Sequence, residues 1–135
     1  KKPYLIGIHI SEGTNLPSGE KISAIRDIID DQLLGIMLSC VSPENFEINL
    51  KELKNLNVPF GFKVNAFVTT KPKDGYTSTF TKSNGNPNEF LGQREDLTPQ
   101  KVGELARNFH NNGATIIGGC CETRPSHIEA MANTI

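Results

Sequence analysis

Two cysteines stand side by side near the end of the chain, in the stretch IIGGCCETRPSHIEAM, and a third, Cys40, lies far upstream. Thiolates are both nucleophiles and metal ligands. An odd number of cysteines fits poorly with a secreted disulfide framework, and adjacent cysteines rarely bond to each other because the ring they form is strained. In a reducing cytosol, clustered cysteines are more often catalytic or metal-binding. The three thiols therefore favour a cytoplasmic protein whose cysteines do chemistry.

Zinc binding is the chemistry that three thiols could do together. Three thiolates at ~2.3 Å from one Zn²⁺ leave one tetrahedral position open, which is typical of a catalytic site rather than a structural one. A soft sulfur ligand suits such a site, and a substrate thiol bound there loses its proton well below its free pKa of ~8.5. We therefore predict a zinc site formed by Cys40, Cys120 and Cys121.

Other residues near the cysteines have weaker indications. Gly118 and Gly119 stand where a strand would need close approach of a ligand or another backbone, so we predict substrate contacts there. Asn65 could orient a metal ligand or approach the substrate, or it could simply form a turn at a strand end. Glu122 and Thr123 are most simply explained as helix-capping residues.

The histidines are not obvious fourth ligands. His9 ends a different strand and could face the substrate or fill the interior of a barrel, whereas His110 and His127 lie in predicted helices.

Two other functions remain open for the cysteines. The same thiols could hold zinc or copper(I) in a module without catalysis, or Cys40 and one of the pair could cycle through a disulfide. The absence of a Cys-x-x-Cys spacing counts against the redox alternative. Buried free cysteines can also act as small hydrophobic residues.

Four strand–helix repeats would position these residues. Apolar runs predict buried strands, and periodic apolar residues after Ser, Thr or Pro predict helices. The expected strands are residues 4–10, 33–39, 59–67 and 114–117, and the expected helices are residues 22–29, 43–53, 99–112 and 125 onward. This alternation predicts an α/β fold with a parallel sheet, corresponding to a (βα)4 half of a (β/α)8 barrel. A small open doubly wound sheet is the alternative, but no dinucleotide or P-loop glycine pattern supports it.

A parallel sheet would bring the three thiols to one place. Cys40 ends the second expected strand, and the cysteine pair ends the fourth. The carboxyl ends of parallel strands share one face, where barrel enzymes keep their chemistry. The polar segment of residues 69–96 is too long for a simple connection, so it is either a lid or donor-binding segment, with Arg94 as its most notable charge, or a mobile surface loop.

The composition excludes some partners. The chain has 135 residues, a net charge of -1 and 21% charged residues, so neither nucleic acid nor an anionic membrane is indicated. No apolar run approaches the ~20 residues that span a bilayer.

The residues Gly-Gly-Cys-Cys-Glu-Thr-Arg-Pro-Ser-His-Ile-Glu-Ala-Met, from Gly118 to Met131, resemble the signature of the homocysteine S-methyltransferase family. Cys40-Val-Ser-Pro is similar to the region of that family's first zinc cysteine, and Asn65 stands at its Pro-Asn turn, with Val64 in place of the proline. The family includes betaine–homocysteine and S-methylmethionine-dependent enzymes and the homocysteine domain of methionine synthase. The resemblance implies a (β/α)8 barrel with zinc held by the residues matching Cys40, Cys120 and Cys121, and methyl transfer to homocysteine to give methionine.

The resemblance covers nearly the whole chain but only part of the family's barrel. It implies that residues 1–135 are the C-terminal half of a homocysteine-binding domain, without the first four βα units and inactive alone. It leaves the methyl donor open among betaine, S-methylmethionine and a methylcobalamin route. Because an isolated half barrel exposes two sheet edges and an apolar face, we also expect a homo-oligomer.

Overall fold

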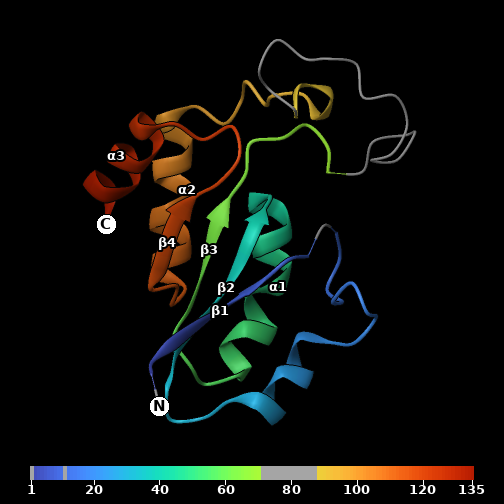
Figure 1. The fold of residues 1–135 in the computed structure, drawn as a ribbon. Coiled ribbons are helices and arrows are strands. Elements are labelled where there is room, and N and C mark those ends of the chain that lie inside the picture. Colours follow the sequence, from blue (N-terminus) through green and yellow to red (C-terminus); the bar gives the residue numbers. More distant parts are fainter. Residues whose placement is uncertain (1, 11, 71–87) are drawn as a thin grey trace.

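Four parallel strands form a single sheet in the order β1-β2-β3-β4. The computed structural model describes residues 2–10, 12–70 and 88–135. The strands are β1 (Tyr4–Ile8), β2 (Leu33–Val41), β3 (Phe60–Val64) and β4 (Ile116–Gly119), and their carboxyl ends point the same way (Figure 1). The predicted α/β fold with a parallel sheet is confirmed, and it is consistent with part of a (β/α)8 barrel.

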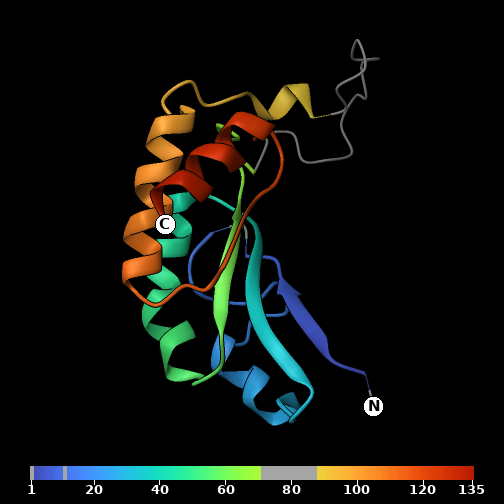
Figure 2. The same ribbon diagram turned by 90° about the vertical axis from the view of Figure 1, so that its left-hand side faces the viewer.

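The helices are α1 (Pro43–Asn55), α2 (Pro99–Asn111) and α3 (Pro125–Thr134). Each begins at a proline, whose missing N–H costs nothing in the first turn. The side chains of Ser42 and Thr98 accept hydrogen bonds from the backbone N–H groups of Asn45 and Lys101, the third residues of α1 and α2, and so act as N-caps. Helices α1 and α2 lie side by side on one face of the sheet, and α3 lies beside β4 (Figure 2).

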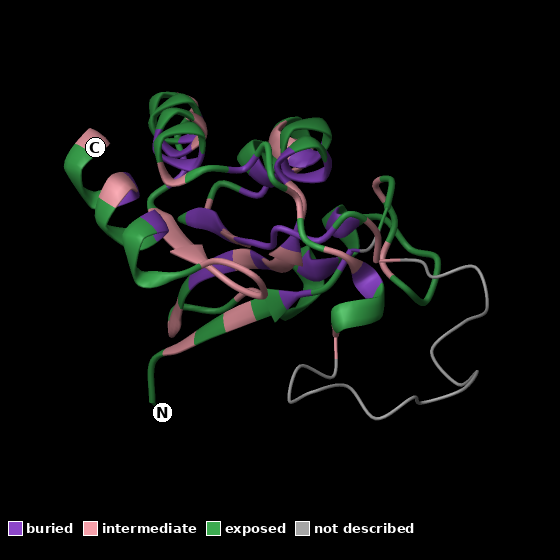
Figure 3. Ribbon diagram, turned by 90° about the horizontal axis from the view of Figure 1, so that it is seen from above, coloured by how far each residue is buried: buried purple, intermediate pink, exposed green. Residues whose placement is uncertain are grey.

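The core lies between the sheet and these two helices, whose buried sides face the strands in Figure 3. Three phenylalanines form its centre, one each from α1, β3 and α2. The ring centroids of Phe46, Phe62 and Phe109 are 4.8 to 5.4 Å apart with tilted or edge-to-face geometry, the arrangement that aromatic quadrupoles favour. This cluster fixes β3 against both helices, and β3 is the strand between the two that carry cysteines.

Two elements differ from the sequence predictions. The segment expected to be a helix over residues 22–29 is a 3-10 helix, η1 (Ile22–Ile28), in which Ile22 and Ile25 are buried and Ile28 is exposed. Residues three apart stack in a 3-10 helix, which places Ile22 and Ile25 together toward the core, whereas Ile28 is the last residue of the element and is exposed. The first strand was expected to be buried, but β1 pairs only with β2 and its Leu5 is exposed, because β1 is an edge of this sheet.

The polar segment of residues 69–96 is described only in part. Residues 71–87 lie outside the described residues, so the lid or donor-binding segment and the surface loop both stay predictions. After them, the short 3-10 helix η2 (Glu89–Leu91) leads the chain back along residues 66–69, where the N–H of Arg94 donates to the carbonyl oxygen of Ala66 at 2.8 Å. Among the described residues, none of the helices combines the length and the apolar character that crossing a membrane requires.

Candidate metal centre

The three cysteine side chains meet at the carboxyl end of the sheet. Cys40 lies near the end of β2, and Cys120 and Cys121 directly follow β4. The Sγ atom of Cys121 is 3.7 Å from that of Cys40 and 3.9 Å from that of Cys120, and all three sulfurs lie within 4.8 Å of one another. Within residues 2–10, 12–70 and 88–135, this is the one such cluster of three or more Cys, His, Asp or Glu ligand atoms. The sheet therefore brings together thiols from two strands that are separated by β3.

The spacing of these sulfurs fits a metal ion. Zinc–sulfur bonds of about 2.3 Å in a tetrahedron place two sulfurs about 3.8 Å apart. The Sγ separations of 3.7 and 3.9 Å agree with this value. Thiolates are soft ligands and suit zinc or copper(I). Three of them leave one tetrahedral position for a further ligand.

The electrostatics of the cluster also favour a cation. Burial, with smaller contributions from the neighbouring thiols of Cys120 and Cys121, raises the pKa of Cys40 to about 12. Burial likewise raises the pKa of Cys121. Without a positive charge, deprotonating one of these partly buried thiols is unfavourable, and each thiolate formed disfavours the next. A bound metal cation would compensate both effects, because a coordinating thiol is deprotonated outright.

The backbone at Cys40 departs from a regular strand. The pairing of β2 with β3 shifts between Ser39 and Val41, and Cys40 has a φ of 55°. This left-handed conformation is uncommon for a residue with a side chain. Such strain persists only where the surroundings fix it, and bulges of this kind are over-represented next to active sites.

Asn65 supplies part of that support. Asn65 directly follows β3 and is buried. Its Nδ2 donates to the carbonyl oxygen of Cys40 at 2.5 Å and lies 3.7 Å from the Sγ of the same cysteine. Its backbone N–H donates to the carbonyl oxygen of Val41 at 2.9 Å, and its Oδ1 accepts from the N–H of Phe67 at 3.3 Å. The side chain therefore faces a cysteine, as expected for a residue that orients a metal ligand. Its predicted contact with the substrate stays a prediction.

The two glycines have different surroundings. A Cβ on Gly118 would lie 3.6 Å from the Cγ of Lys63, an ordinary contact. A Cβ on Gly119 would collide with the Oγ1 of Thr123 and lie 3.1 Å from the Cδ1 of Ile128. The close neighbour that Gly119 accommodates is thus a side chain of the same chain. The predicted substrate contacts of both glycines stay predictions.

Comparison with known proteins settles the family. The profile described as "Homocysteine S-methyltransferase" matches residues 1–135. The chain belongs to the homocysteine S-methyltransferase family. This agrees with the resemblance of the Gly-Gly-Cys-Cys segment, which in the folded chain carries two of the three clustered thiols.

Curated members of this family are similar to the chain at low identity. Homocysteine S-methyltransferase YbgG of Bacillus subtilis is 26% identical over 126 residues, covering 93% of this chain and 34% of its own length. Homocysteine S-methyltransferase 1 of Saccharomyces cerevisiae is 28% identical over 141 residues, covering 99% of this chain and 40% of its own length. The corresponding protein of Zea mays is 25% identical, over 92% of this chain and 35% of its own length. The chain thus spans between a third and two-fifths of these relatives.

The three histidines of the chain lie near main-chain carbonyl oxygens. The Nδ1 atom of His9 is 3.3 Å from the carbonyl oxygen of Ser39, and that of His110 is 3.0 Å from the carbonyl oxygen of Ala114. His127 is buried, with Nε2 3.0 Å from the carbonyl oxygen of Leu97. None of these histidines belongs to the cysteine cluster of the described chain.

The helix cap predicted at Glu122 and Thr123 is wrong. The N-cap of α3 is Arg124, whose N–H donates to the Nδ1 of His127 at 3.0 Å. Thr123 instead closes the turn after the cysteines, because its Oγ1 donates to the carbonyl oxygen of Cys120 at 2.6 Å. Glu122 has a φ of 61° in that turn.

The residues that sequence reasoning missed act through their main chains. The N–H of Cys120 donates to the carbonyl oxygen of Val64 at 2.7 Å, and the N–H of Ala66 donates to the carbonyl oxygen of Cys121 at 3.0 Å. The end of β3 therefore holds both adjacent cysteines, while Asn65 holds Cys40 from the same three-residue stretch. A main-chain contact of this kind leaves no signal in residue type.

Proposed function

We propose that the protein of which this chain forms part transfers a methyl group to the thiol of homocysteine, giving methionine, with a zinc ion held by Cys40, Cys120 and Cys121. The bond between the methyl carbon and its donor breaks, a bond from that carbon to the homocysteine sulfur forms, and the thiol proton is released. The observation that carries the proposal is the cluster of three thiols at zinc-like spacing in a chain of this family. The similarity to curated homocysteine S-methyltransferases supports the reaction.

Zinc bound here would accept the sulfur of homocysteine at its open position and lower the pKa of that thiol, making it a nucleophile at neutral pH. The protein's part is to hold the three sulfurs in place. Asn65 fixes the backbone of Cys40, and the end of β3 fixes the other two cysteines through main-chain hydrogen bonds. Gly118 and Gly119 lie just before the cysteine pair, and we assign their backbone, with the Asn65 amide, to contacts with homocysteine.

The proposal also covers the compartment, the methyl donor and the oligomeric state. Three free thiols suit a reducing compartment, so we place the protein in the cytoplasm. The methyl donor is betaine, S-methylmethionine or methylcobalamin. Helices α1 and α2 cover one sheet face (Figure 2), and Leu5 and Leu34 are exposed on β1 and β2. We infer that this chain by itself associates with further copies through its exposed strand edges, which sedimentation across micromolar concentrations would test.

The test begins with zinc content. Elemental analysis of protein purified under reducing conditions should give about one zinc per chain, and Cys40→Ala, Cys120→Ala and Cys121→Ala should each lose it. Ser126→Ala is the matched control, because Ser126 is exposed in the first turn of α3, five residues after Cys121 in the sequence. This control should keep its zinc. Absence of zinc from reduced wild-type protein would contradict the metal assignment.

Activity then separates the candidate functions. Zinc binding together with methyl transfer to homocysteine by the full-length protein supports the methyltransferase. Zinc or copper(I) binding without methyl transfer from any of the three donors supports a non-catalytic metal-binding module. The 3.7 Å between the Sγ atoms of Cys40 and Cys121 also permits a redox pair. A reversible disulfide in a protein that binds no metal would support that alternative.

A further inference from the structure

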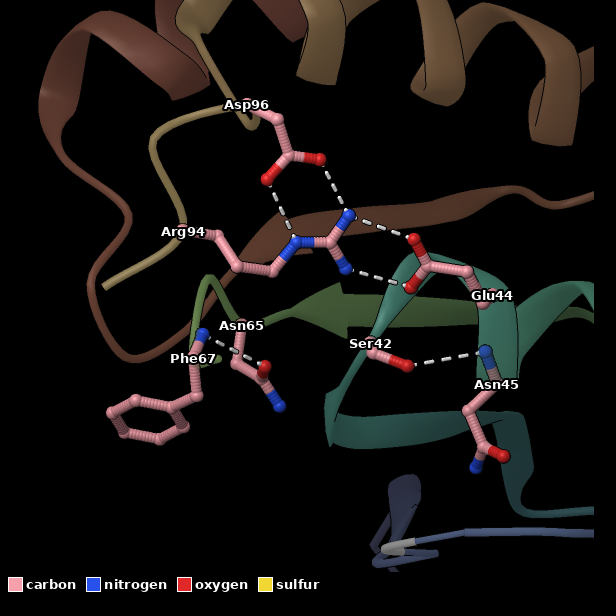
Figure 4. A network of polar contacts seen from close by, with 7 residues as sticks. All are labelled: Ser42, Glu44, Asn45, Asn65, Phe67, Arg94 and Asp96. Carbon is pink, nitrogen blue, oxygen red and sulfur yellow. Dashed lines mark hydrogen bonds and ion pairs between the residues drawn. The ribbon is translucent and has the colours of Figure 1, made fainter. Parts of the chain in front are cut away.

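Arg94 joins two segments that are far apart in the sequence. Its Nη1 and Nη2 donate to the two carboxylate oxygens of Glu44, each at 2.8 Å. Its Nε and Nη2 donate to the two oxygens of Asp96 at 3.0 and 2.7 Å. The guanidinium therefore lies between two carboxylates, each bound by two hydrogen bonds (Figure 4). Because each carboxylate is bound by two parallel hydrogen bonds, its orientation relative to the guanidinium is fixed. A lysine ammonium could pair with the same carboxylates but could not fix their orientation.

Arg94 joins the first turn of α1 to its own segment, and each of the two is connected to a cysteine of the cluster. Glu44 lies in the first turn of α1, four residues after Cys40, and Ser42 caps that helix between them. The backbone N–H of Arg94 donates to the carbonyl oxygen of Ala66 at 2.8 Å. Ala66 is part of the stretch after β3 that holds Cys121, and its neighbour Asn65 holds Cys40. The ion pairs thus link the support of the cysteine pair to the helix that follows Cys40.

The location of this link matters because Cys40 needs external support. Its φ of 55° is a strained conformation, and strained residues keep their geometry only where several contacts fix them. Two of those contacts come from Asn65. The other end of the strained segment is fixed by the start of α1, which Arg94 holds through Glu44.

The ion pairs of Arg94 are not explained by the overall stability of the fold. The side chains of Glu44 and Asp96 are 62% and 64% exposed, so solvent screens even these bidentate pairs and limits what they add to the stability of the fold. A planar cation held at three of its nitrogens is instead well suited to fixing the segment that carries Arg94 against the first turn of α1.

We propose that Arg94 is a positioning residue for the thiol cluster: it ties the segment after β3 to the N-terminus of α1 and so holds Cys40 at ligand distance from the Cys120–Cys121 pair. This inference rests on the proposed zinc site. It predicts that the loss of Arg94 weakens metal binding without removing any ligand. Because Arg94 acts through the backbone, we expect a loss of about tenfold in zinc affinity, at the lower end of the effect of residues that orient metal ligands.

The experiment measures zinc affinity by competition with a chromophoric chelator under reducing conditions, using the wild type, Arg94→Gln, Arg94→Lys and Lys101→Gln. The last variant is the matched control, because it removes another surface cation that pairs with a carboxylate, Glu104, at 3.8 Å. Thermal unfolding of each variant shows that it is folded at the temperature of the assay. The absorption spectrum of the cobalt-substituted protein at saturating metal reports the geometry of the thiolate ligands. A change in the stability of the fold alone would not alter this spectrum.

We expect Arg94→Gln to lose about tenfold in affinity and to change the cobalt spectrum, Arg94→Lys to lose less, and Lys101→Gln to match the wild type. Wild-type affinity and spectrum in a folded Arg94→Gln would overturn this inference and leave the zinc site intact. Should Arg94→Gln fail to fold, an unchanged affinity and spectrum in Arg94→Lys would overturn it equally. A wild type that binds neither zinc nor cobalt would overturn the zinc site itself, and the inference with it.

Discussion

Gly61 on β3 pairs directly with Ile116 on β4 and leaves no room for a side chain, so a methyl group there should disturb the sheet that positions the thiols. A Cβ on Gly61 would collide with the carbonyl oxygen of Ile116 and lie 2.5 Å from its carbonyl carbon and 2.6 Å from its Cβ. Two of these three atoms are backbone, which cannot swing away as a side chain can. The Gly61→Ala variant must therefore move β3 and β4 apart at the pair Gly61↔Ile116.

The expected loss of stability follows from this clash. Overpacking costs about 1–3 kcal/mol, and a backbone clash belongs at the upper end, near about 3 kcal/mol. The unfolding entropy is about 2.1 cal/mol/K per residue, which for 135 residues gives about 0.28 kcal/mol/K. A loss of about 3 kcal/mol then lowers Tm by about 10 °C.

The assay is thermal and urea unfolding of Gly61→Ala beside Gly118→Ala, a matched glycine on the neighbouring strand. A Cβ on Gly118 meets only ordinary contacts, at 3.6 Å from the Cγ of Lys63 and 3.9 Å from the carbonyl oxygen of Phe62. Alanine there should change stability by less than about 1 kcal/mol, because replacing a strand glycine is by itself mildly favourable. Equal Tm values for the two variants would refute the close approach of β3 and β4 at Gly61.

Three further variants test the core, a helix cap and an ion pair. Phe46→Ala should cost about 3–5 kcal/mol of unfolding free energy, since it empties the centre of the ring cluster with Phe62 and Phe109; urea unfolding measures it, and a loss below 1 kcal/mol would contradict the packing. Ser42→Ala should cost about 1 kcal/mol by removing the N-cap of α1, whereas Ser42→Asp should cost little. The hydrogen bond from the Arg94 guanidinium holds the pKa of Glu44 below its ordinary 4.5. A carboxylate whose pKa is lowered in the folded state stabilises the fold at pH values above its ordinary pKa. The contribution of Glu44 to the free energy of unfolding should therefore fade as the pH falls below about 4.5. Glu44→Gln should weaken that pH dependence in unfolding measured from pH 7 to pH 3.

The sequence was sufficient to predict the parallel sheet and the meeting of the three thiols, because parallel strands share one carboxyl edge. It was also sufficient for the starts of α1 and α2, where the pairs Ser42-Pro43 and Thr98-Pro99 carry the signal. It was misleading at η1, because isoleucines three and four apart suit an α-helix and a 3-10 helix alike. It was also misleading at Glu122 and Thr123, since a turn that closes on Cys120 uses the same polar residues as a helix cap.

The main-chain contacts of the site could not have been predicted. Val64 and Ala66 are ordinary apolar residues by type, yet their carbonyl and N–H groups hold Cys120 and Cys121. Such contacts depend on where β3 ends relative to β4, which residue types do not encode. The ion pair of Arg94 with Glu44 was equally hidden, because the two residues are 50 positions apart in the sequence and only the folded chain brings them together.

The bulge in β2 shows how the fold turns a core strand into a ligand-bearing one. Ile36 and Leu38 are fully buried, and strict alternation would send Cys40 to the same face, among the core residues under α1. The register shift between Ser39 and Val41 changes that alternation, so that Val41 pairs with Val64 and takes the buried position. Cys40 is left unpaired in a left-handed conformation, with its sulfur beside that of Cys121. One extra residue therefore lets β2 keep an unbroken apolar face while presenting a thiol at its end, and the contacts from Asn65 are what this irregularity requires.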